Sequence, residues 1–170
     1  MSIWLAFTTS MFVFAVPAQS LNWQNPEVFR INKEPARSFF YSYDNADAAF
    51  SKTPWDQPNH ILLNGQWKFN WVNSVKKKPD DFYQTNFDHS QWGQIAVPAN
   101  WEVNGYGTPF YHSHQCFKAN AVPPEMPVHY NPVGSYLKTF TLPAEWTKKQ
   151  VFVHFGAVKS AFYLWINGQE

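Results

Sequence analysis

The stretch LNGQWKFNW, residues 63–71, decides the fold class of this chain. Its aromatic residues occupy every second position, as Trp67, Phe69 and Trp71, with polar residues between them. Successive side chains of a β-strand point to opposite faces of a sheet. The alternation therefore predicts an antiparallel strand with an aromatic face in the core and a polar face in solvent. The Asn64-Gly65 pair before it predicts a turn.

Further segments downstream carry the signature of short strands. We predict strands at 94–97, at 134–143, and on both sides of 156–159 within QVFVHFGAVKSAFYLWING, residues 150–168. A proline stops each of the first two, because proline has no amide hydrogen for a ladder bond. Short strands at this spacing, without long amphipathic helices between them, predict an all-β sandwich or jelly roll.

The last residues carry a turn signal. Asn167-Gly168 is favoured in two-residue hairpin turns, because both central residues need positive φ. No returning strand follows in the sequence, and an unpaired sheet edge is a liability for a folded protein. We therefore expect a sandwich that is incomplete at the C-terminus, as the front part of a longer protein.

Composition divides the chain into three segments. Residues 1–18, MSIWLAFTTSMFVFAVPA, carry no charge, and we interpret them as a signal peptide cleaved after Ala18 or Ser20. A membrane anchor is the alternative, but the run is shorter than the roughly 20 residues that a bilayer helix needs. Residues 19–60 predict an extended arm with one helical turn near 45–50, and residues 61–170 predict the jelly-roll domain.

Charge and composition exclude several classes of function. The chain is 45% hydrophobic and 15% charged, which is typical of a water-soluble globular domain. A formal net charge of +1 gives no field to attract nucleic acid or anionic lipid. The basic run 76–78 predicts a solvated loop. Cys116 is the only cysteine, so no intrachain disulfide forms.

The long segment 99–133 holds five prolines and predicts an ordered, functional loop. Within it, His112, His114 and Cys116 fall at every second position. In a strand the outer two would lie about 13 Å apart. Zinc–ligand bonds are only about 2.0–2.3 Å long. We therefore predict ordinary loop histidines and no metal site.

Carboxylates and aromatic rings of the same loop are the other candidates. An acid–base hydrolase needs two converging carboxylates. The spacing of Glu102 and Glu125 does not fix their separation, and surface glutamates are common, so we predict no catalytic residue here. Loop aromatic rings can stack on sugar rings. The candidates for such contacts are Trp101, Tyr106, Phe110 and Tyr111.

Five motifs, in order, resemble the amino-terminal region of the large β-galactosidases of glycoside hydrolase family 2. They are NWQNPEVFRINKEPARSFFYSY, LNGQWKFNW, VPANWEVNGYGTPFY, NPVGSY and GAVKSAFYLWINGQ. The resemblance covers about residues 22–170. It implies a galactose-binding-like β-sandwich, the sugar-binding domain, ahead of a barrel that carries two catalytic glutamates. It further implies retaining hydrolysis of terminal β-D-galactosides, with both glutamates outside these 170 residues.

The resemblance also implies substrate-binding residues. In the family an Asn within a Pro-x-Tyr-x-Asn pattern contacts galactose. Here Pro109 and Tyr111 match, while Ser113 takes the place of the Asn. We expect Ser113 or its neighbour His112 to make the sugar contact, with His114 as a further substitute.

The same resemblance implies the cofactors, substrate and assembly of the full-length enzyme, whereas net charge and residues 1–18 bear on its other partners and its location. Mg²⁺ and Na⁺ are implied for the full-length enzyme, a β-galactoside is implied as its substrate, and a homo-oligomer is implied as its assembly. We expect no nucleic acid partner and no stable membrane anchor. The signal peptide predicts a periplasmic or secreted protein, with a cytoplasmic one as the alternative. A non-catalytic carbohydrate-binding module and a related β-glucuronidase or β-mannosidase are the alternative functions.

Overall fold

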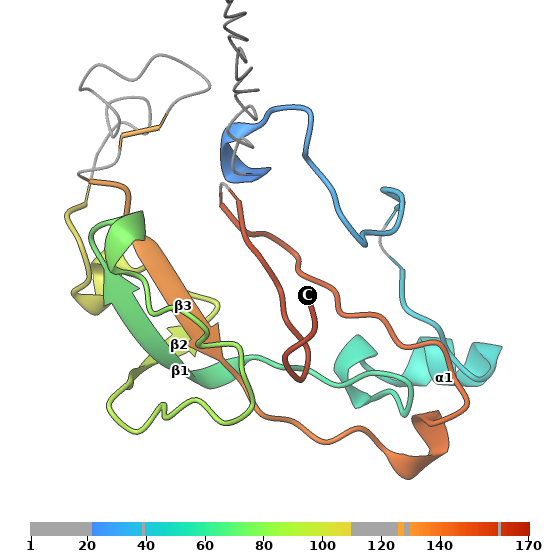
Figure 1. Ribbon diagram of the computed structural model, residues 1–170. Coiled ribbons are helices and arrows are strands. Elements are labelled where there is room, and N and C mark those ends of the chain that lie inside the picture. Colours follow the sequence, from blue (N-terminus) through green and yellow to red (C-terminus); the bar gives the residue numbers. More distant parts are fainter. Residues whose placement is uncertain (1–21, 39, 110–125, 128–129, 160) are drawn as a thin grey trace, which may run out of the picture.

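The computed structural model describes residues 22–38, 40–109, 126–127, 130–159 and 161–170. An open, antiparallel, three-stranded sheet forms one side of the molecule, in the order β2-β1-β3 (Figure 1). The strands are β1 (Gly65–Val72), β2 (Gly93–Val97) and β3 (Val133–Leu137), and β1 lies between the other two (Figure 1). The predicted all-β class is confirmed by this sheet.

The aromatic face of β1 forms the core, as its alternation predicts. Phe69 is 1% exposed and pairs with Gly93 of β2 and Tyr136 of β3. Trp67 pairs with Ile95, which is 2% exposed. Residues directly opposite one another on neighbouring strands share a face, so these side chains form one apolar layer. The core is small, and Phe69 is its centre.

Two strand boundaries differ from the sequence prediction. The pair Asn64-Gly65 forms no turn; instead Gly65, with φ of 113°, is the first residue of β1. The third strand was expected to reach residue 143 and ends at Leu137. Beyond that point the chain leaves β1, and the Lys138 ammonium donates a hydrogen bond of 3.1 Å to the carbonyl of Gln66. This side chain replaces the ladder bond that a longer strand would have made.

Helical structure is sparse. The only α-helix of the described residues is α1 (Ala46–Ser51), and its existence confirms the helical turn predicted near 45–50. Asn45 caps it, because its side-chain oxygen accepts a hydrogen bond of 2.8 Å from the amide of Ala48. Short 3₁₀ turns complete the set: η1 (Asn22–Gln24), η2 (Pro54–Asp56), η3 (Val75–Lys77), η4 (Glu102–Asn104) and η6 (Ala144–Trp146).

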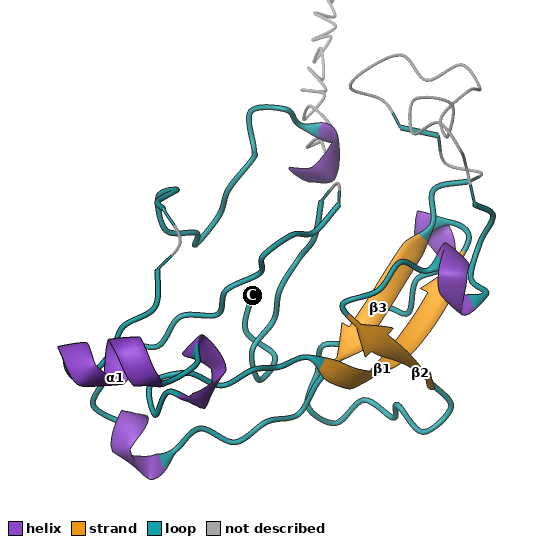
Figure 2. Cartoon of the chain, turned by 180° about the vertical axis from the view of Figure 1, so that it is seen from behind, coloured by secondary structure: helices purple, strands orange, loops and turns teal. Residues whose placement is uncertain are grey.

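The arm lies against η6, on the side of the molecule away from the sheet (Figure 2). Trp146 is 9% exposed, and its indole N–H donates a hydrogen bond of 3.1 Å to the carbonyl of Pro58. Lys149 donates a bond of 2.6 Å to the side chain of Asn59. These bonds join segments almost 90 residues apart in sequence. They fix the end of the arm before β1 begins.

The strands predicted on both sides of 156–159 do not form a ladder among the described residues. The two segments run side by side as extended chain (Figure 1), and their rings meet where Phe155 and Phe162 lie 5.1 Å apart between centroids. Phe152 and Phe162 are 48% and 47% exposed. A strand needs a hydrogen-bonding neighbour in register, and the sheet of this structure ends at β3. The strand prediction is therefore wrong here.

The terminal turn is present. Asn167 and Gly168 have φ of 51° and 83°, and Ile166 and Gln169 exchange backbone hydrogen bonds of 2.8 and 3.1 Å. This is the predicted two-residue turn. Among the described residues, no helix has the length and apolar character needed to span a bilayer.

Candidate functional site

The predicted sugar-contact residues, Ser113 and His112, lie outside the described residues, as do His114, Cys116, Phe110, Tyr111 and Glu125. The structure describes the two ends of the loop that carries them. The first end runs from β2 to Pro109, and the second enters β3 from Tyr130. The geometry of these two ends decides how the loop is attached to the sheet.

The first end is bound to the sheet by Trp101. Its indole N–H donates a hydrogen bond to the hydroxyl of Tyr136 on β3. Its carbonyl accepts a bond of 3.1 Å from the amide of Tyr106. Between them, η4 ends at Gly105, whose φ of 85° closes the turn. The loop therefore starts from a compact turn that is attached to β3 through one side-chain bond.

Two of the predicted sugar-contact aromatics pack on the core instead of standing free. The ring of Tyr106 meets Phe69 edge to face, with 4.8 Å between centroids, and the ring of Trp101 lies 6.3 Å from Phe69. Both side chains are half-buried. Aromatic pairs in this arrangement contribute about 0.5–1.5 kcal/mol beyond the area they bury. These rings hold the loop on the sheet.

Sequence reasoning missed Gly134 and Tyr136. A Cβ on Gly134 would lie 2.8 Å from both Phe69 Cε2 and Trp101 Cζ2, so only glycine allows the two rings to approach β3. The signal for this contact was the glycine inside the predicted strand GSY, since an interior strand glycine marks a close approach.

The second end of the loop returns to the same end of the sheet. The amide of Asn131 donates a hydrogen bond of 3.1 Å to the carbonyl of Asn73, which follows β1. A Cβ on Gly107 would lie 3.3 Å from the Trp71 ring and 3.7 Å from the Tyr130 hydroxyl. Gly107, at the first end, therefore lies close to Trp71 of β1 and to Tyr130 of the second end. In Trp71 itself the buried group is the indole nitrogen. It has no hydrogen-bond partner among the described residues.

Few charged groups occur in the described part of the loop base. Glu102 is the only carboxylate in the described part of the loop, and it is exposed. Burial raises the pKa of Tyr136 above its ordinary value of 10.0, while the Trp101 hydrogen bond acts in the opposite direction. No cluster of three metal-ligating side chains occurs in the described ranges. The described part of this base thus combines one exposed carboxylate with one half-buried tyrosine hydroxyl.

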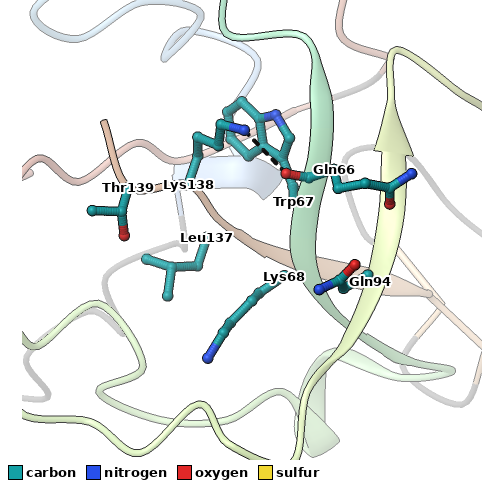
Figure 3. A pocket seen from close by; sticks show the side chains of 7 residues that line it. All are labelled: Gln66, Trp67, Lys68, Gln94, Leu137, Lys138 and Thr139. Atoms are coloured by element: carbon teal, nitrogen blue, oxygen red, sulfur yellow. Dashed lines mark hydrogen bonds between the residues drawn. The ribbon is translucent and has the colours of Figure 1, made fainter. Parts of the chain in front are cut away.

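A pocket of about 260 Å³ lies on the polar side of the sheet (Figure 3). It is formed where β3 ends and the chain bends away from β1. Lys68 faces Gln94 on one side and Leu137 on the other, which follows from the strand register. The lining consists of Gln66, Trp67, Lys68, Gln94, Leu137, Lys138 and Thr139. It contains no carboxylate.

Comparison with known proteins finds one matching family and several similar proteins. The family described as glycosyl hydrolases family 2, sugar binding domain, matches residues 61–170. A β-galactosidase of Priestia megaterium is 32% identical over 167 residues, which cover 95% of this chain and 16% of the relative. Those of Halalkalibacterium halodurans and Yersinia enterocolitica are 34% and 36% identical, over 88% and 87% of this chain. The chain spans only 14–16% of the length of these relatives.

Proposed function

The chain belongs to the sugar-binding domains of glycosyl hydrolase family 2, and we propose that it is the amino-terminal part of a β-galactosidase. The enzyme would hydrolyse terminal, non-reducing β-D-galactose residues. The observation that carries this proposal is the similarity to a protein named β-galactosidase along 95% of the chain. A family match over 61–170 supports the sugar-binding role of the sheet and its loop.

In this proposal the bond-breaking acids lie elsewhere in the protein. Retaining hydrolysis needs one carboxylate as nucleophile and a second as acid and base, about 5–5.5 Å apart. The described part of the loop offers the single carboxylate of Glu102. The relatives are about six times longer than this chain, which leaves ample sequence for a catalytic domain. By itself the chain would be inert toward galactosides.

The role proposed for the chain is to shape the galactose pocket through the loop 99–133. Ser113 and His112 are the residues proposed to contact the sugar. The first loop end packs on Trp71, Phe69 and Tyr136, and the second end is bound to Asn73 through Asn131. These attachments support the role, because a binding loop needs a rigid base. A hydroxyl such as that of Ser113 would donate or accept one bond with a sugar hydroxyl.

The identity of the sugar is tested with the full-length protein and chromogenic β-galactoside, β-glucuronide and β-mannoside. We expect hydrolysis of the galactoside at a kcat/KM well above that of the other two. A preference for the glucuronide or mannoside would overturn the assignment. Galactose binding without any hydrolysis would favour a carbohydrate-binding module.

The sugar contact is tested separately with Ser113→Ala in the full-length enzyme. Loss of one neutral hydrogen bond costs about 0.5–1.5 kcal/mol, so KM for the galactoside should rise about threefold to tenfold. The matched control is Ser42→Ala, which removes a hydroxyl from an exposed position of the arm. An unchanged KM in Ser113→Ala would remove this residue from the pocket.

Cofactors, assembly and location are parts of the same proposal. We propose, as the family resemblance implies, that Mg²⁺ and Na⁺ bind in other parts of the enzyme. Chelation should then lower galactosidase activity without altering the fold of this domain. We further propose an exported homo-oligomer. Amino-terminal sequencing of the mature protein tests the signal peptide, and a start at Met1 would contradict it.

A further inference from the structure

The pocket on the polar side of the sheet has no part in the proposed hydrolysis, and its chemistry differs from that of the loop. Two ammonium groups, from Lys68 and Lys138, line it together with hydrogen-bond donors from Gln66, Gln94 and Thr139. No carboxylate is in the lining. We propose that this pocket binds an oxyanion: a sulfate, phosphate or carboxylate group, free or carried on a sugar.

Both lysines are partly held in place. The ammonium of Lys68 donates a hydrogen bond of 3.3 Å to the carbonyl of His89, and that of Lys138 donates one of 3.1 Å to Gln66. An ammonium has three N–H donors, so each lysine keeps two for a ligand. A side chain already tethered loses less rotamer entropy on binding. Figure 3 shows the two lysines on opposite sides of Leu137, so positive charge borders the pocket from two directions.

One acid, Asp88, interacts electrostatically with Lys68 but lies outside the pocket lining. Asp88 accepts hydrogen bonds of 2.8 Å and 3.0 Å from the amide and hydroxyl of Ser90. These bonds lower the pKa of Asp88, and the Lys68 ammonium adds to the lowering. Asp88 is therefore ionised, but its oxygens are engaged by Ser90 and it is not in the pocket lining. Within the described ranges, Lys68 forms no ion pair.

Size and exposure set the class and strength of the ligand. Pockets for drug-sized ligands measure about 300–1,000 Å³. A volume of about 260 Å³ suits one small anion or one charged sugar residue. Lys68 is exposed to solvent, and salt screens such charges over about 10 Å at 0.1 M. Binding should accordingly have a Kd on the order of millimolar at low salt and weaken as salt is added.

Calorimetric titration of the intact protein tests the proposal. Inorganic phosphate is the first probe, glucose 6-sulfate and glucuronate represent anions carried on a sugar, and glucose is the neutral control. The double variant K68Q/K138Q should lose about tenfold in affinity. The matched control K76Q/K77Q removes the same charge from the exposed turn η3 and should bind as the wild type does.

A charge placed inside the pocket gives a second test that keeps both lysines. Gln94 pairs with Lys68 across the two strands. The carboxylate introduced by Q94E would therefore form an ion pair with the Lys68 ammonium and abolish anion binding. Binding of phosphate without binding of glucose 6-sulfate or glucuronate would support a site for a free oxyanion and exclude an oxyanion carried on a sugar. No binding by the wild type, or equal losses in the two lysine pairs, would overturn the proposal. Galactoside hydrolysis is measured in parallel and is expected to be unchanged, which separates this proposal from the proposed activity.

Discussion

The indole N–H of Trp101 donates a hydrogen bond to the hydroxyl of Tyr136, and this bond attaches the start of the long loop to β3. The two residues are 35 positions apart in sequence. Their rings also lie on the same buried residue, Phe69, at centroid distances of 6.3 and 4.6 Å. A substitution at Tyr136 should therefore destabilise the start of the loop as well as the strand.

The variant Tyr136→Phe keeps the ring contacts and removes the acceptor of the Trp101 bond. An unpaired, partly buried donor costs about 1–2 kcal/mol. Hydrogen-exchange mass spectrometry on the intact protein should show faster exchange in peptides covering 101–107 and 133–137. The control Tyr163→Phe alters a side chain that is 39% exposed, and its effect should stay within about 0.5 kcal/mol. Equal protection in both variants would contradict the role of this bond.

The variant Gly134→Ala tests the close approach of the two rings to β3. Its new methyl group would lie 2.8 Å from Phe69 Cε2 and from Trp101 Cζ2, so the rings must shift. Overpacking of this kind costs about 1–3 kcal/mol, and we expect a lower melting temperature in calorimetry. Gly156→Ala is the matched control, since no atom of the described residues lies within 4 Å of the Cβ that the substitution adds. If both variants melt alike, Gly134 has no packing role.

The variant Trp146→Phe tests how the arm is attached. It removes the indole donor to Pro58 from a residue that is 9% exposed. A lost hydrogen bond of about 1 kcal/mol should raise the open population of the arm about fivefold. Limited trypsin cleavage after Lys52 should accelerate by at least that factor. Trp55→Phe, at a ring that is 54% exposed, serves as the control, and equal acceleration there would refute the assignment.

Alkaline pH should weaken the base of the loop. Burial raises the pKa of Tyr136 in the folded state above the ordinary 10.0. A group whose pKa is raised by folding makes its full contribution to folding stability below its unfolded-state pKa. That contribution is lost as the pH rises through its folded-state pKa. The melting temperature should thus fall above about pH 10, and the fall should be smaller in Tyr136→Phe. Calorimetry across that range measures it, and parallel curves for the two proteins would disprove this coupling.

Several features were open to prediction from sequence because their causes are local. The alternation around Phe69 predicts one buried face, since the side chains of a strand change sides at every residue. The burial of Phe69 confirms this prediction. Asn45 caps α1 with its own side chain. Asn167-Gly168 forms the terminal turn, because Asn and Gly readily adopt the positive φ that its two central positions require.

Other features depended on partners far away in the chain, and only the tertiary structure decided them. Trp101 and Tyr106 were predicted as candidates for sugar contact, and both pack on Phe69. Gly134 leaves room for the Trp101 ring on β3, and Gly93 leaves room for the Tyr106 hydroxyl on β2. The apolar segments around 156–159 have the composition of strands, yet they form no ladder in the described part of the chain. Alternation and turn preference depend on residues that are adjacent in the chain, so the sequence alone predicts them. Pairing and close packing require two surfaces to meet in space, and only the folded chain determines which surfaces those are.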